Sequence, residues 1–206
     1  MLVSALLVVL LPRFSLEAPV NKREVSARTK DVLLSMYHVC ISKPKLMDLT
    51  RETKEAYAKE HFGDPLESRQ VDINGIEPLS NSKERTVQLV VSKAFKQLSI
   101  FHALFEDLLG HLNQTNEKHN IVNKTEAMKK KMKELERLAT IAANFEFDKS
   151  LAYSTSSSVA TSLKQQKAVW TKSAFRQKTW ILGVLREFDI CLRYLQPAFL
   201  EFSSFS

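Results

Sequence analysis

The sequence predicts an all-α fold, a four-helix bundle whose helices run up, up, down, down. Three observations lead to this prediction. The 206 residues include only 4 glycines and 6 prolines, fewer turn residues than a β-rich domain of this length needs. Apolar residues recur every three or four positions over long stretches, as on one face of an α-helix. Two long connections flank a shorter one, so each long connection can cross the full height of the bundle.

The first predicted helix, helix A, covers about residues 29–62 and is the least regular. Its composition is helical throughout, but Pro44 interrupts it. Either the helix kinks at this proline, or a short segment precedes a helix that starts near Lys43. Gly63, with Pro65 close behind it, is a natural stop for the helix.

Helix B, about residues 82–112, has the clearest pattern, and Ser82 is its expected N-cap. The spacing of its apolar positions alternates between four and three residues. These positions are Val87, Val91, Ala94, Leu98, Phe101, Phe105, Leu108 and Leu112.

Helix C is predicted over about residues 124–147, with Thr125 as its cap. Its apolar side consists of Met128, Met132, Leu135, Leu138, Ala139, Ala142 and Phe145. The opposite face carries mostly lysine and glutamate, including the run KKKMK at 129–133. Such a run indicates a solvated face, and polysaccharide binding is the alternative.

Helix D is predicted over about residues 163–195, and Pro197 should end it or closely follow its end. One side is lined by Ala174, Ile181, Val184, Leu185, Phe188, Cys191, Leu192 and Leu195.

The N-terminal residues 1–18 are predicted to be a signal peptide, which leaves residues 19–206 as the mature domain. The apolar run from Leu2 to Leu11 is shorter than the roughly 20 residues that span a bilayer, and it stands at the chain terminus. A membrane anchor and a buried N-terminal helix are the alternatives. Asn113 and Asn123 each begin an N-x-[ST] sequon, which indicates N-glycosylation of a secreted chain.

The two cysteines, Cys40 and Cys191, suggest one disulfide in a secreted protein, or else two buried free thiols. In the predicted topology the beginning of helix A lies near the end of helix D. A Cys40–Cys191 bridge would therefore tie the first helix to the last.

The formal net charge is +7, and basic proteins attract nucleic acid, anionic membranes or sulfated polysaccharide. Polysaccharide is the accessible partner outside the cell and nucleic acid is not expected; solubility alone is the other interpretation. The sequence contains no G-x-S-x-G, H-E-x-x-H, C-x-x-C or glycine-rich phosphate loop, motifs that would indicate an enzyme or a metal site. We therefore expect a binding protein without catalytic residues, metal or cofactor.

Phe175 and Lys178 stand out at the beginning of helix D. At 100° per residue, Phe175 lies about 135° from the centre of the apolar face, and Lys178 lies about 60° from Phe175. The two side chains could form one exposed patch of an aromatic ring and a cation, which is typical of interface anchors. The alternative is that Phe175 packs beneath a long connection.

With these features, the chain resembles the long-chain helical cytokines of the interleukin-6 family. The segment FRQK, Phe175–Lys178, matches the F-x-x-K motif of the subgroup that includes leukaemia inhibitory factor, oncostatin M, ciliary neurotrophic factor and the cardiotrophins. The segment EAYAKEHFGDPLE at 55–67 is also similar to ciliary neurotrophic factor and the cardiotrophins. Those two groups lack a conventional signal peptide, and leukaemia inhibitory factor has more cysteines, so the chain combines features of both branches.

The resemblance implies a secreted, monomeric ligand that bridges receptor chains and thereby activates Janus kinase/STAT signalling. Phe175 and Lys178 would engage a leukaemia inhibitory factor receptor-like chain, and helices A and C would engage the glycoprotein 130 signal transducer. A specificity receptor would meet the end of helix D and the A–B connection. The alternative function is a secreted basic helical protein that binds anionic lipid or glycosaminoglycan.

Overall fold

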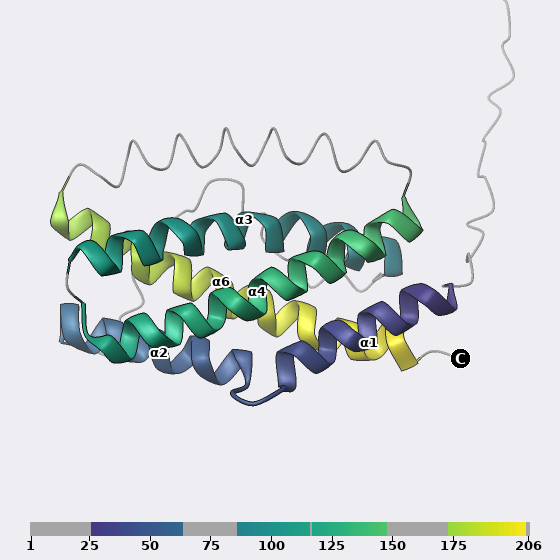
Figure 1. The fold of residues 1–206 in the computed structure, drawn as a ribbon, viewed down its shortest axis with the longest axis horizontal. Helices are drawn as coiled ribbons and strands as arrows, with labels where there is room; N and C mark the ends of the chain where they lie inside the picture. Colours follow the sequence, from purple (N-terminus) through teal and green to yellow (C-terminus); the bar gives the residue numbers. More distant parts are fainter. Residues whose placement is uncertain (1–25, 64–85, 116, 148–172, 205–206) are drawn as a thin grey trace, which may run out of the picture.

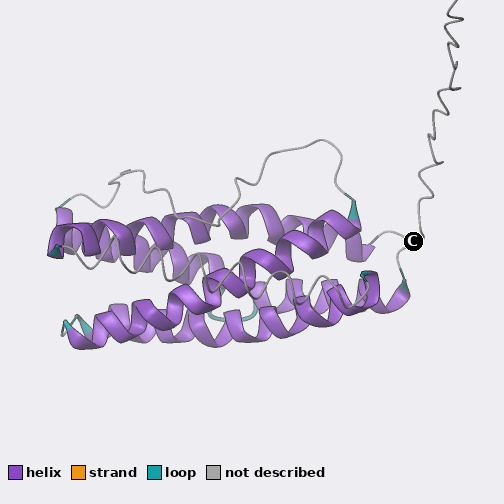
Figure 2. Cartoon of the chain, turned by 90° about the horizontal axis from the view of Figure 1, so that it is seen from above, coloured by secondary structure: helices purple, strands orange, loops and turns teal. Residues whose placement is uncertain are grey.

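The computed structural model describes residues 26–63, 86–115, 117–147 and 173–204. Within these ranges there are five α-helices and no strand, which confirms the all-α prediction for the described part of the chain. The helices lie along one shared long direction (Figures 1 and 2). Together they form a helical bundle.

The region predicted as helix A consists of two helices, α1 (Ala27–Ile41) and α2 (Leu46–Phe62). Pro44 stands between them; it has no N–H to donate, and its ring clashes with a helical carbonyl one turn earlier. Of the two alternatives, the separate short segment is therefore the one observed. The predicted stop at Gly63 is confirmed: its φ is 74°, a left-handed conformation that glycine adopts without a Cβ clash.

Helix α3 (Val87–Gln114) corresponds to predicted helix B. The described helix is capped by Thr86, whose hydroxyl accepts a hydrogen bond from the backbone N–H of Leu89 at 3.2 Å. The predicted cap, Ser82, lies outside the described residues. All of the apolar positions predicted for helix B are buried, so this face is confirmed.

Helix α4 (His119–Glu146) begins before the predicted start near Lys124, and the prediction that Thr125 caps it was wrong. Thr125 is buried inside the helix, where its hydroxyl donates a hydrogen bond to the carbonyl of Ile121 at 2.7 Å. The additional turn buries the side chains of Ile121 and Val122. Because that burial favours helix at this point, the helix extends past its most obvious capping residue.

Helix α6 (Ala174–Ser204) continues through Pro197, so the prediction that helix D ends near this proline was wrong. Residues 163–172 of the predicted helix lie outside the described residues. A proline inside a helix costs about 3 kcal/mol. Beyond it, Phe199 and Phe202 are both buried, and burying each phenylalanine contributes about 1.5–3 kcal/mol. Packing of the last turns therefore offsets the cost of the proline.

Two of the predicted apolar positions, Phe145 and Ala174, are exposed and do not belong to the core. They occupy the last turn of α4 and the first residue of α6. The other predicted positions of helices C and D are buried: Met128, Met132, Leu135, Leu138, Ala139, Ala142, Ile181, Val184, Leu185, Phe188, Cys191, Leu192 and Leu195.

Contacts between helices show how the neighbouring helices are paired. In each of four pairs of packed segments, a residue near the start of one segment contacts a residue near the end of the other. A later residue of the first segment then contacts an earlier residue of the second. The two chain segments of each pair therefore run in opposite directions. The contacts are Thr29–Glu146 and Glu60–Lys118 for α1/α2 with α4, Lys54–Asp189 and Phe62–Phe175 for α2 with α6, His102–Glu136 and Glu106–Lys129 for α3 with α4, and Lys93–Tyr194 and Phe105–Phe188 for α3 with α6.

One hydrophobic cluster joins all five helices. At its centre the ring of Phe188 from α6 lies between those of Phe101 and Phe105 from α3, with each pair of ring centroids 5.0 Å apart. None of the described helices has a stretch both long and apolar enough to cross a membrane.

Candidate functional site

The first turn of α6 is held by Ser173, immediately before the helix. Its hydroxyl accepts a hydrogen bond from the backbone N–H of Arg176 at 3.2 Å, and its carbonyl accepts one from that of Gln177 at 3.0 Å. These bonds satisfy donors that the first turn otherwise leaves unpaired. Phe175 and Lys178 are therefore displayed from a capped helical turn.

Phe175 is 58% exposed, the highest value among the exposed large hydrophobic side chains of the described residues. Its ring rests edge-on against Phe62, the last residue of α2, with centroids 6.2 Å apart and an interplanar angle of 80°. This T-shaped arrangement is a favoured one for aromatic pairs. The prediction that Phe175 lies away from the core is confirmed; both long connections that could cover it lie outside the described residues.

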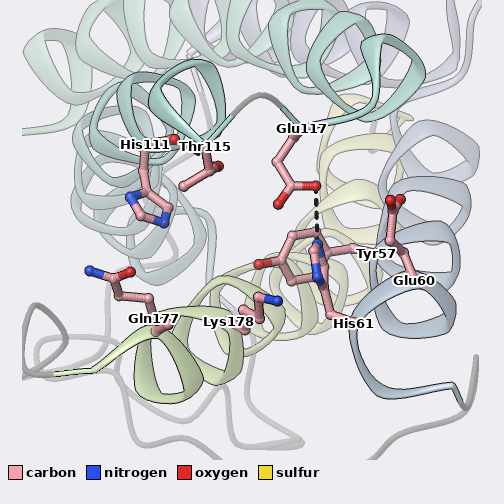
Figure 3. Close-up of a pocket in the computed structure, with 9 residues that line it drawn as sticks. Tyr57, Glu60, His61, His111, Thr115, Glu117, Gln177 and Lys178 are labelled. Atoms are coloured by element: carbon pink, nitrogen blue, oxygen red, sulfur yellow. Dashed lines mark hydrogen bonds and ion pairs between the residues drawn. The ribbon is translucent and has the colours of Figure 1, made fainter.

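Lys178, one turn further along α6, is half-buried and lines a cavity of about 410 Å³ at this end of the bundle. The cavity is formed by the end of α2, the turn between α3 and α4, and the beginning of α6 (Figure 3). Its lining consists of Tyr57, Glu60, His61, His111, Thr115, Glu117, Ala174, Gln177 and Lys178. Of the two residues of the predicted patch, Lys178 lines this cavity and Phe175 does not.

Both carboxylates of the cavity have partners. Glu117 lies 3.1 Å from Nε2 of His61, and both side chains are 9% exposed. Glu60 lies 3.1 Å from the ammonium of Lys118. In contrast, no ion pair is recorded for Lys178 within the described ranges.

Two other lining groups are electrically neutral near pH 7. Burial raises the pKa of the Tyr57 phenol, and the negative charges of Glu117 and Glu60 raise it further. Burial lowers the pKa of His111, although Glu117 opposes this effect. The ring of Tyr57 also packs on that of His61, with centroids 4.2 Å apart, which holds the imidazole beside Glu117.

The sequence alone does not place Phe62 beside Phe175, because the two residues are separated by more than a hundred positions. A local signal does exist: Phe62 immediately precedes the capping Gly63, so its side chain must lie at the very end of the bundle. Which residue packs against Phe62 depends on the direction in which α6 runs.

Cys40 in α1 and Cys191 in α6 are both buried free thiols. Burial raises the pKa of Cys40 to about 12. Burial also raises the pKa of Cys191, and the nearby Cys40 contributes to that shift. The two thiols are not joined, so the predicted Cys40–Cys191 disulfide is not formed in this structure, and the alternative of two buried free thiols is the one observed.

The two sequon asparagines are both exposed. Asn113 is in the last turn of α3, and Asn123 is in the second turn of α4. In the second sequon the hydroxyl of Thr125 is buried, but the asparagine itself faces outward. Among the described residues, no three histidine, cysteine, aspartate or glutamate side chains gather as a metal site.

Neither the protein-family models, nor the curated proteins, nor the solved structures returned a match.

Proposed function

We propose that this chain is a secreted helical cytokine that bridges a leukaemia inhibitory factor receptor-like chain and glycoprotein 130, and so activates Janus kinase/STAT signalling. The observation that carries the proposal is Phe175, exposed and supported by Phe62, with Lys178 one turn away. These residues occupy the positions that the F-x-x-K resemblance assigns to receptor contact.

The proposal includes an up-up-down-down bundle of the long-chain cytokine type, with residues 64–85 and 148–172 as its long crossovers. Its support is the pairing of the described helices: α4 and α6 each run opposite to α3 and to the α1/α2 segment. In the proposed topology, each of the other two connections would join segments that run in the same direction.

The two proposed receptor surfaces lie on different parts of the bundle. The F-x-x-K surface combines the beginning of α6 with the end of α2. The glycoprotein 130 surface is formed by the outer faces of α1, α2 and α4, which pack together over much of their length. Separate surfaces would let one monomeric ligand hold two receptor chains at once. A specificity receptor would contact the end of α6 and the connection between α2 and α3.

Secretion completes the proposal. Residues 1–18 would be the signal peptide, Asn113 and Asn123 would carry N-linked glycans, and Cys40 and Cys191 would form a disulfide. The exposure of both asparagines supports the glycosylation assignment, and the packing of α1 against α6 supports the pairing of the two cysteines.

The test measures binding of the purified protein to the ectodomain of leukaemia inhibitory factor receptor. We expect Phe175→Ala to weaken binding about 30-fold or more, since a hot-spot aromatic contributes about 2 kcal/mol or more. Lys178→Met keeps the alkyl chain and removes the charge, and we expect a loss of about tenfold. Because the phenylalanine contact is apolar, its effect should persist at high salt.

Phe145→Ala is the matched control, because Phe145 is also an exposed phenylalanine, at 45%, but lies on the last turn of α4. It should leave this affinity unchanged. Equal effects of Phe145→Ala and Phe175→Ala would contradict the proposal. A second readout is STAT phosphorylation in cells that express glycoprotein 130 with or without the receptor. A response that does not require the receptor would rule out the bridging role.

A further inference from the structure

The basic run of α4, residues 129–133, is not one uniform solvated face, because its lysines point in different directions. Lys129 forms an ion pair with Glu106 of α3 at 3.1 Å. Lys131 donates hydrogen bonds to the carbonyls of Val39 and Ser42, both at 3.0 Å. These two lysines hold α4 to its neighbouring helices and are not available to a ligand.

Lys130 and Lys133 are different. Both are on the outer side of the helix, and within the described ranges neither has a carboxylate partner. Together with Arg137 they follow the spacing i, i+3, i+7, so the three cations lie within about 60° of one another around the helix. The row is about 10 Å long at a rise of 1.5 Å per residue.

The three cations line a shallow cavity of about 370 Å³ between α4 and α3. Its two carboxylates are both engaged. Glu134 accepts hydrogen bonds from Arg137 at 2.7 and 3.0 Å, and Glu136 lies 2.6 Å from Nδ1 of His102. The charges of Lys130 and Lys133 are therefore left uncompensated beside the cavity.

We propose that Lys130 and Lys133, with Arg137 beside them in its pair with Glu134, form a binding site for the sulfate groups of a sulfated polysaccharide. A row of cations along one helix matches a linear polyanion, which can place successive sulfates along it. The charge of +7 on the whole chain attracts such a polymer at long range. Polysaccharide is accessible because the protein is secreted, and on this point the inference rests on the proposed function.

An anionic membrane fits the same surface less well. A helix that lies on a membrane needs an apolar face that enters the acyl boundary. The exposed large hydrophobic side chains of the described residues are Leu34, Phe145, Phe175, Ile190 and Leu200, and none of them lines this cavity. The site is polar throughout and so favours a soluble polyanion.

The sulfate site is remote from Phe175. Along α4, Lys130 is about 18 Å from Lys118 at the helix start, and Lys118 reaches the end of α2 through Glu60. The polysaccharide and the leukaemia inhibitory factor receptor-like chain could therefore occupy the protein together, which would keep the ligand at the cell surface.

The test is equilibrium binding to heparin over a series of NaCl concentrations. We expect Lys130→Gln/Lys133→Gln to weaken binding about tenfold or more near 0.15 M salt. The magnitude of the slope of log affinity against log salt concentration should fall by about 1.5. With two fewer contacts to sulfate groups, binding releases fewer counterions.

The matched control is Arg28→Gln/Lys45→Gln. Both residues are exposed, stand at the beginnings of α1 and α2, and have no carboxylate partner within the described ranges. This variant loses the same net charge, so it should retain the slope and most of the affinity. Equal losses for the two double variants would overturn the site, because the binding would then follow net charge alone.

Two further measurements separate the alternatives. Stronger binding to vesicles of anionic lipid than to heparin, lost in Lys130→Gln/Lys133→Gln, would also overturn the proposal, because it would assign the surface to a membrane. Binding to the receptor ectodomain should be the same for both double variants and for the unmodified protein. If the unmodified protein fails to bind heparin but binds the receptor, only this inference is refuted. If it binds heparin but not the receptor, the receptor proposal is refuted.

Discussion

Asp189 is a buried carboxylate, with a side chain 6% exposed, and it is held by two cations. The ammonium of Lys54 in α2 lies 2.8 Å away, and the guanidinium of Arg193, one turn along α6, lies 3.2 Å away. Burial acts to raise the pKa of Asp189, but the hydrogen bonds from Lys54 and Arg193 outweigh it and hold this pKa below its usual value. The residue is thus charged in the folded protein and joins α2 to α6.

We expect Asp189→Asn to lower the free energy of unfolding by about 1–3 kcal/mol, because it leaves Lys54 without its buried partner. Urea denaturation measures this change. Asp48→Asn is the control, because Asp48 is 46% exposed and pairs with Arg51 on the surface; it should cost less than about 1 kcal/mol. A change at Asp189 no larger than that at Asp48 would show that the buried contact adds nothing.

The same residue predicts a pH dependence. Since the folded pKa of Asp189 is lowered, its stabilisation is fully present above the unfolded pKa of about 3.9 and is lost as the pH falls through the folded value. Unfolding curves between pH 6 and pH 3 should therefore converge for the unmodified protein and Asp189→Asn. Curves that remained equally far apart over this range would assign the stabilisation to another group.

At the scale of the elements, Lys131 connects α4 to the end of α1. Its ammonium donates hydrogen bonds to the carbonyls of Val39 and Ser42 and, at 2.6 Å, to the hydroxyl of Ser42. The carbonyls at the end of a helix lack partners within it, and α1 ends at Ile41. Lys131 therefore completes the end of a helix that the chain itself cannot continue past Pro44.

We expect Lys131→Met to reduce the free energy of unfolding by about 1–2 kcal/mol, since it removes hydrogen bonds from a charged donor that is partly exposed. Amide exchange should become faster in the last turn of α1. The adjacent Lys130→Met is the control; it removes the same charge from an exposed position and should change stability by less than about 0.5 kcal/mol. Equal effects at positions 130 and 131 would indicate that the cap contributes no stability.

For the molecule as a whole, the two cysteines decide whether the first and last helices are covalently joined. Both thiols are buried, so reagents added to the folded protein would underestimate free thiols. We expect the protein, expressed through the secretory pathway and denatured without reductant, to gain two hydrogen atoms in intact mass on reduction. The bond would add at most about 4–5 kcal/mol through chain entropy. An unchanged mass, with both cysteines alkylated after denaturation, would show that the thiols remain free.

Much of this fold follows from local pattern. The alternating spacing in α3 places one continuous apolar face on the core, because an α-helix repeats every 3.6 residues wherever it occurs. The same geometry places Phe175 away from the core of α6, and the structure confirms this with an exposed fraction of 58%. These properties depend on a residue and its near neighbours in the chain.

The two prolines show where local pattern is insufficient. Pro44 separates α1 from α2, whereas α6 continues through Pro197. A proline inside a helix would cost about the same at either position. The outcome at Pro197 differs because the rings of Phe199 and Phe202, beyond the proline, are buried. Their burial depends on the packing of distant helices, which the local sequence does not specify.

The sequence by itself determined that the chain is helical, which faces are apolar, and that Phe175 and Lys178 lie off the core stripe of the last helix. Only the tertiary structure decided that Phe175 rests on Phe62, that Lys178 faces a cavity, and that Lys130 rather than Lys131 is available for an external anion. The reason is physical. Helical periodicity is set within a few residues, but the exposure and the partner of a side chain depend on which distant helix packs beside it.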